Sequence, residues 1–172
     1  MGLSYGLTAA GLRNRVNQEK SDTDPEMSYD EAEAIVSDYF RQFYGVRQWI
    51  EAQRSSGQKL GYVETKSGRR MYINRYSYQW LNNAINSPIQ GGAADCTKTA
   101  LILFRKACKE NKIPYPVVNV VHDEIVIDCP SVNMDTAYLH LEQSMITAGE
   151  TIYANVPFAV EKFRGKHWGI KH

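Results

Sequence analysis

Apolar positions in the first third of the chain recur at the spacing of an α-helix. Ser28 and Glu31 form a capping box, in which the Ser28 hydroxyl accepts from the backbone N–H of Glu31 and the Glu31 carboxylate reaches back to the N–H of Ser28. This pattern predicts a helix that Gly45 ends or kinks, and a second helix from Val46 that stops at Gly57. The apolar stripe of the first helix comprises Ala32, Ile35, Val36, Tyr39, Phe40 and Phe43.

The middle of the chain changes from helical to alternating spacing and back. Residues 61–74 hold two short β-rich runs around a turn in which Gly68 can take positive φ, which predicts a β-hairpin. A short helix is expected over Trp80 to Ile85, followed after an interruption at Pro88 by a long helix that runs to about Glu110. The long helix is predicted to bury Ile89, Ala93, Cys96, Thr97, Ala100, Leu101, Phe104 and Cys108.

The last third begins with two runs of β-branched residues, 117–121 and 124–128. Only His122 and Asp123 separate them, so we expect a tight hairpin with its charged residues at the turn. Ser131 is predicted to cap a final helix.

Gly149 is predicted to close that final helix, and a last strand is expected from about 158 to 163. Taken together, the elements predict an α+β fold in which helices pack on a small, mainly antiparallel sheet.

Composition narrows the class of protein only modestly. The chain has 172 residues, of which 43% are hydrophobic, as in a globular protein. It has no apolar run of the roughly 18 residues that a membrane span needs, so no membrane association is expected. Its three cysteines lack metal-ligand spacing and fit reduced thiols in a cytoplasmic protein.

Charge is unevenly distributed along the chain. Lys and Arg total 20 against 19 acids, but residues 22–38 hold seven acids and no base, which leaves 12 acids and a net charge of +8 elsewhere. This permits nucleic-acid binding, although a scattered solvated surface would look the same. The candidate phosphate-facing bases are Arg69, Arg70, Arg105, Lys106, Lys109, Lys162, Arg164 and Lys166.

The most chemically distinctive segment is the predicted turn at residues 121–125. It places two carboxylates, Asp123 and Glu124, side by side. Adjacent negative charges repel and raise each other's pKa unless a cation offsets them. Mg²⁺ prefers oxygen ligands and usually takes one or two carboxylates, so a magnesium site is one reading; an ordinary turn Asp beside a solvated Glu is the other.

A second segment, residues 84–95, combines amide side chains with small residues. The amides of Asn86 and Gln90 could read minor-groove acceptors without strong sequence dependence. The glycines and alanines at 91–94 would let a duplex or a backbone approach closely. An ordinary helix start, capped by Asn86 or Ser87 with Pro88 in its first turn, explains the same pattern.

A third segment, residues 3–16, begins on a Tyr- and Gly-rich sequence with no capping signal before it. We expect it to be the end of a helix whose beginning is missing. Tyr5 next to Gly6 gives an aromatic face with an open side, which suits stacking on a base at about 1–3 kcal/mol. A buried Tyr at a helix end is the alternative.

In order and spacing, these three segments resemble conserved blocks of family A (bacterial polymerase I-like) DNA polymerases. Tyr5-Gly6 is similar to the end of motif B in the fingers, residues 85–95 to the palm helix that touches primer-template DNA, and residues 121–124 to motif C. Lesser similarities lie at Gly61-Tyr62-Val63-Glu64-Thr65, Gly68-Arg69-Arg70, Val156-Pro157, Val160-Glu161, Trp168 and His172. The resemblance covers nearly the whole chain from Leu3.

The resemblance implies a DNA-directed DNA polymerase that uses primer-template DNA, deoxynucleoside triphosphates and two Mg²⁺ ions about 4 Å apart. Asp123 would be a direct metal ligand, Glu124 a weaker or more distant one, and His122 would hold the primer terminus. Tyr5 would stack at the template position, with Gly6 giving clearance. The minor-groove contacts of the new duplex would fall to Asn86 and Gln90.

The same resemblance implies that residues 1–60 are the C-terminal part of the fingers and residues 61–172 part of the palm. Motif A, with its aspartate, and the thumb are missing; Ser37-Asp38-Tyr39 is only superficially similar to motif A, because it lies inside the capped helix. Asn82 stands where many members carry a DNA-binding Arg, and Asn14 also replaces an Arg, although Arg13 is adjacent.

We therefore expect the isolated chain to be unable to polymerise DNA until a segment with motif A and the thumb completes it. A subunit of a split polymerase, an excised fragment and a remnant all fit; the remnant would be a non-catalytic DNA-binding or assembly module. A bacterial or phage-infected host cytoplasm is the expected location.

Overall fold

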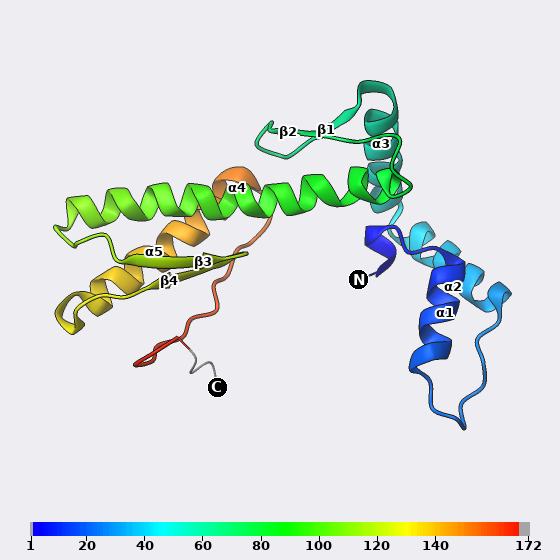
Figure 1. Cartoon of the computed structure of the whole chain (residues 1–172), viewed down its shortest axis with the longest axis horizontal. Helices are drawn as coiled ribbons and strands as arrows, with labels where there is room; N and C mark the ends of the chain where they lie inside the picture. Colours follow the sequence, from blue (N-terminus) through cyan, green and yellow to red (C-terminus); the bar gives the residue numbers. More distant parts are fainter. Residues whose placement is uncertain (1, 169–172) are drawn as a thin grey trace. The chain divides into compact units, whose positions relative to one another are not determined.

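The computed structural model describes residues 2–168, which form two compact units. One unit comprises residues up to 65 with 70–89, and the other comprises 66–69 with the residues from 90 onward. Each unit is described by itself, and Figure 1 shows the elements of both in sequence colours. His172, one of the positions similar to the family's C-terminal end, lies outside the described residues.

Residues 3–16, which the sequence predicts to be one helix end, fall into two separate elements. A short 3₁₀ helix, η1 (Gly2–Tyr5), stops where Gly6 adopts a left-handed φ of 89°. A separate helix, α1 (Ala9–Glu19), then begins with its own cap, because the Thr8 hydroxyl accepts from the backbone N–H of Gly11 at 3.2 Å.

The two predicted helices that follow are present with shifted borders. The capping box of Ser28 and Glu31 starts α2 (Tyr29–Gln42), as predicted. The chain breaks at Phe43 rather than Gly45, and α3 (Tyr44–Leu60) runs through Gly57 to end at the left-handed Gly61. Gly57 is a packing residue instead of a helix end, because a Cβ there would lie 3.1 Å from Cβ of Ala84.

The predicted hairpin at 61–74 is confirmed. Strands β1 (Tyr62–Glu64) and β2 (Arg70–Tyr72) pair antiparallel with Val63 opposite Met71. Gly68 takes the expected left-handed φ, 85°. Beside the hairpin, the buried side chains of Val63, Ile73 and Ala84 form the small core of this unit.

Helix α4 (Trp80–Glu110) is continuous, which corrects the expected break at Pro88. Proline removes only one intrahelical hydrogen bond, the one to the carbonyl four residues earlier, on Ala84. Ala84, Ile85 and Pro88 are all buried, and this packing holds the helix together across the defect.

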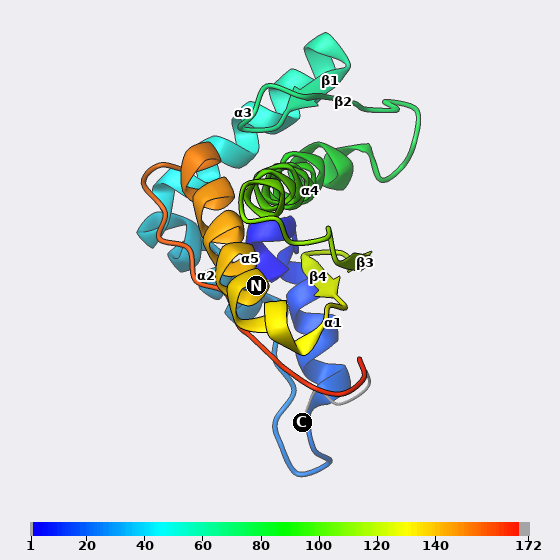
Figure 2. The same ribbon diagram turned by 90° about the vertical axis from the view of Figure 1, so that its left-hand side faces the viewer.

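The second unit has its own hairpin and core. Strands β3 (Val117–Val121) and β4 (Glu124–Ile127) pair antiparallel and lie near helix α5 (Ser131–Ile152), as Figures 1 and 2 show. Buried side chains from α4, the hairpin and α5 form one cluster: Ala100, Phe104, Cys108, Ile113, Ile125, Ala137, Leu141 and Ala148. Of the predicted face of α4, Ile89 and Ala93 are exposed.

Three predictions for the C-terminal third are wrong. Ser131 is inside α5, whose N-cap is Pro130 with no side-chain bond. Gly149 does not close the helix but lies inside α5. Glycine is required there because a Cβ would collide with the ring of Phe158. Residues 158–163 form no strand; Phe158 packs its ring on Tyr153 instead.

The two sheets are both small and antiparallel, and most of the described chain is helical. The α+β class is therefore confirmed. In the described part of the chain, no helix combines the length and the apolar character that crossing a bilayer requires.

Candidate functional site

The β3–β4 hairpin presents its acidic turn to solvent. Val121 pairs with Glu124, so His122 and Asp123 alone form the connection. His122 has a left-handed φ of 56°, which is uncommon for a residue with a Cβ. Both turn side chains are exposed. The predicted tight turn is therefore present, with a strained residue directly before Asp123.

Glu124, the first residue of β4, is half-buried and held from a distant part of the chain. Its Oε1 accepts a hydrogen bond of 2.6 Å from Nε1 of Trp168, 44 residues later. The resemblance places Trp168 at the family's C-terminal end but does not predict this contact, because no local pattern indicates a partner so far along the chain. Asp123 makes no hydrogen bond or ion pair to any other described residue, so its carboxylate is free to meet a ligand.

These two carboxylates could provide some of the ligands of a magnesium ion. Both offer the hard oxygen donors that Mg²⁺ prefers, and one or two protein carboxylates are its usual complement. Among residues 2–168 no three His, Cys, Asp or Glu side chains gather closely enough to hold an ion. A closed site made only of protein groups is therefore not found within these residues.

A cavity of about 460 Å³ lies in the first unit at the start of the chain. The structure brings Tyr5, Gly6 and Asn82 together there, and Gly2, Leu7 and Thr8 complete its lining. Tyr5 is 40% exposed, and the Oδ1 of Asn82 lies 3.0 Å from where a Cβ on Gly6 would be. A larger residue at position 6 would also need a left-handed φ, so glycine is suited to this spot.

Asn86 and Gln90 follow Asn82 along α4 at intervals of four residues. Gln90 is exposed, whereas Asn86 is half-buried. The Oδ1 atom of Asn86 is buried and has no hydrogen-bond partner among the described residues. Such atoms are uncommon in proteins and call for an explanation, such as a ligand or water.

Arg13 lies half-buried on α1, where its Nη2 donates to Oδ1 of Asn14 at 3.1 Å. The predicted site residues thus fall in both units. Tyr5, Gly6, Arg13, Asn82 and Asn86 belong to the first, and Gln90, His122, Asp123 and Glu124 to the second.

Five of the eight candidate phosphate-facing bases also form ion pairs within the chain. Each of five basic side chains forms an ion pair with a carboxylate: Arg69 with Asp95, Arg70 with Glu64, Lys106 with Glu110, Lys162 with Glu142 and Arg164 with Asp135. Arg105 lies over the ring of Tyr115 at 6.0 Å. In three of these pairs, those of Arg70, Lys106 and Arg164, both side chains are well exposed, so the pairs are weak in water.

Two protonated groups lie near Asp95. Burial, and then the charge of Asp95, raises the pKa of the Cys96 thiol. The pKa of Tyr153 is raised by burial first, with Cys96 and Asp95 adding to it. Because the thiolate is the reactive form of cysteine, Cys96 is unsuited to act as a nucleophile.

Comparison with known proteins gives a consistent result. The family model described as DNA polymerase family A matches residues 1–170. DNA polymerase I of Aquifex aeolicus (strain VF5) is 34% identical over 97% of this chain and 28% of its own length. DNA polymerase I of Lactococcus lactis subsp. lactis (strain IL1403) is 31% identical over 97% of this chain and 18% of its own length.

A solved structure is also similar. The POL domain of Pol1 from M. smegmatis, a complex with DNA primer-template and dNTP, superposes with a TM-score of 0.72 and 30% sequence identity. The match covers 86% of this chain and 26% of that one. The chain thus spans less than a third of the length of each of these relatives.

Proposed function

This chain belongs to DNA polymerase family A, and from that premise we propose that it is the C-terminal palm-and-fingers part of a DNA-directed DNA polymerase. The observation that carries the proposal is the acidic turn. Asp123 is exposed, and Glu124 is adjacent to it and oriented by Trp168. This arrangement supplies one side of a magnesium-dependent site for nucleotidyl transfer.

The residues of the turn have different parts in the proposed chemistry. Asp123 would hold magnesium directly, because its carboxylate has no competing partner among the described residues. Glu124 would hold it less tightly, since one of its oxygens already accepts from Trp168. His122 would contact the primer terminus. Bound magnesium would lower the pKa of the primer 3′-hydroxyl and offset the charge on the departing pyrophosphate.

Primer-template DNA and deoxynucleoside triphosphates are the proposed partners. The M. smegmatis structure contains both, and the family relationship extends them to this chain as a proposal. The cavity lined by Tyr5, Gly6 and Asn82 would receive a template base, with the Tyr5 ring stacking on it. The amide N–H groups of Asn86 and of the exposed Gln90 would donate to acceptors in the minor groove.

Completion by another segment is part of the proposal. Among the described residues, no third His, Cys, Asp or Glu side chain joins the two carboxylates of the turn in a group that could hold a metal ion. The relatives are more than three times as long as the stretch that this chain matches. A segment carrying motif A and the thumb would supply the remaining metal ligand and the remaining contacts to DNA.

Primer extension tests this proposal. The chain, a segment that carries motif A and the thumb, and an equimolar mixture of the two are each assayed with primer-template, dNTPs and Mg²⁺. We expect extension from the mixture and none from either component. A stable complex of the two that does not extend the primer would contradict the proposed polymerase activity. Duplex binding that weakens with salt would in that case favour the non-catalytic alternative.

A further inference from the structure

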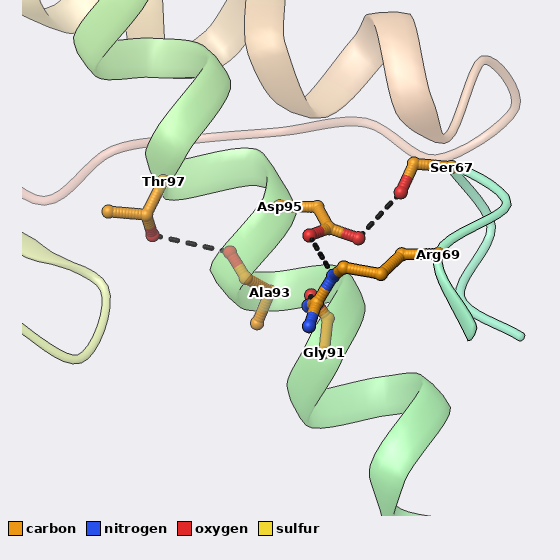
Figure 3. A network of polar contacts seen from close by, with 6 residues as sticks. All are labelled: Ser67, Arg69, Gly91, Ala93, Asp95 and Thr97. Atoms are coloured by element: carbon orange, nitrogen blue, oxygen red, sulfur yellow. Dashed lines mark hydrogen bonds and ion pairs between the residues drawn. The ribbon is translucent and has the colours of Figure 1, made fainter. Parts of the chain in front are cut away.

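The tip of the β1–β2 hairpin is bonded to one turn of helix α4 (Figure 3). Ser67 Oγ donates to Oδ2 of Asp95 at 2.5 Å, and Arg69 Nε donates to Oδ1 of the same carboxylate at 2.8 Å. Arg69 Nη2 also donates to the carbonyl oxygen of Gly91 at 2.8 Å. The two attachment points, Gly91 and Asp95, are four residues apart and therefore enclose one helical turn.

The sequence of this turn, and of the residues just before it, is the least favourable for a helix within α4. Pro88, just before it, leaves the helix without one backbone hydrogen bond. Gly91 and Gly92 have the high chain entropy that makes glycine unfavourable inside a helix. Without outside support, residues 88–92 are where α4 would bend or open.

The contacts around the turn supply that support from two directions. On one side, the Asp95 side chain is only 12% exposed and accepts from both hairpin residues. On another, Gly92 is so close to the hydroxyl of Tyr153 that a Cβ would collide with it. A half-covered guanidinium between a carboxylate and a carbonyl makes stronger bonds than an exposed pair.

We infer that Arg69 and Asp95 are positioning residues, which hold the turn of α4 that follows Gln90 and thereby set the affinity for duplex DNA. The inference rests on the proposed function, in which Gln90 contacts the minor groove. It assigns Arg69 to holding the helix instead of binding phosphate. Asp95 acts through the same turn and touches no DNA.

The two roles of Arg69 predict different salt dependence. A phosphate-binding base contributes to the slope of affinity against salt concentration, and its loss reduces that slope by about 1. A positioning residue changes affinity and leaves the slope as it was. Duplex binding by the full chain is therefore measured by fluorescence anisotropy over a range of salt, for the wild type, Arg69→Met and Asp95→Asn.

We expect Asp95→Asn and Arg69→Met to weaken binding about tenfold at constant slope. In the Gln90→Ala background, Asp95→Asn should cause no further loss, because its effect passes through Gln90. A slope reduced by about 1 in Arg69→Met, or full additivity of Asp95→Asn with Gln90→Ala, overturns the inference.

Hydrogen exchange gives a second readout that needs no DNA. Amides of residues 91–95 should exchange faster in Asp95→Asn, while Glu64→Gln, which removes the exposed pair with Arg70 on the same hairpin, should leave them unchanged. Unchanged exchange at 91–95 in Asp95→Asn overturns the inference. Should that variant fail to fold, Ser67→Ala removes one of the bonds to Asp95 and keeps the Arg69 pair.

The outcomes separate the inference from the proposed function. A wild-type chain that binds no duplex even at low salt contradicts the proposed DNA contact, and the exchange measurement still decides whether Arg69 and Asp95 hold the turn. A wild type that binds, with an unaffected Asp95→Asn, contradicts the inference alone.

Discussion

The indole N–H of Trp168 donates to a carboxylate oxygen of Glu124 at 2.6 Å, which ties the C-terminal segment to the first residue of β4. A hydrogen bond to an ionised carboxylate is stronger than one between neutral groups. It fixes the direction of Glu124 beside Asp123, so the C-terminal segment takes part in shaping the acidic turn.

Replacing Trp168 by Phe keeps most of the ring and removes the donor. In the polymerase completed by its second segment, we expect the maximal rate of extension to fall about three- to tenfold, since hydrogen bonds to charged groups contribute about 1.5–3 kcal/mol when buried and less at this exposure. The KM for dNTP should change little. Trp49→Phe, on α3, is the matched control; equal rates for the two variants would contradict the role of this bond.

The contact between Gly92 and Tyr153 predicts a specific pattern of stability. Gly92→Ala adds a methyl group where the Tyr153 hydroxyl lies, and overpacking of this kind costs about 1–3 kcal/mol. Tyr153→Phe removes the hydroxyl and should restore most of the loss in the double variant, because the next ring atom is 3.2 Å from the added Cβ. Urea unfolding of the four proteins measures this; additive losses would argue against the clash.

The capping box of α2 predicts a dependence on pH. The backbone N–H and the hydroxyl of Ser28 lower the pKa of Glu31 below its ordinary value of 4.5. A carboxyl group with a lowered folded-state pKa adds stability above its unfolded pKa, and this is lost as the pH falls through the folded value. The advantage over Glu31→Ala should thus be full at neutral pH and shrink below pH 4.5.

An NMR titration of Glu31 checks this directly. Its midpoint should lie below 4.5 in the wild type and return towards that value in Ser28→Ala. A wild-type midpoint at or above 4.5 would show that the box does not hold the ionised carboxylate.

The features that the sequence predicts correctly depend on short-range interactions. The Ser28 capping box, the Gly68 turn and the two-residue turn at Asp123 each depend on residues a few positions apart, and all three were predicted correctly. Their neighbours along the chain decide their conformation, so pattern and turn chemistry suffice.

The wrong predictions share a different cause. The sequence predicts helix ends at Gly57 and Gly149, but each lies inside a helix where another part of the chain packs closely, Ala84 in one case and Phe158 in the other. The sequence predicts a break at Pro88, but α4 continues through this residue, which is buried together with Ala84 and Ile85. The bonds of Trp168 to Glu124 and of Arg69 to Asp95 join residues 44 and 26 positions apart, beyond the reach of any local pattern.

The central claim is that Asp123 carries metal for nucleotidyl transfer, and single-turnover extension by the completed polymerase tests it most directly. Asp123→Asn is compared with Asp128→Asn, which alters an exposed carboxylate at the end of the same hairpin. Metal ligation is worth several kcal/mol to the transition state, so we expect a fall of about a thousandfold for Asp123→Asn and an unchanged rate for Asp128→Asn. Equal rates for Asp123→Asn and the wild type would contradict the claim.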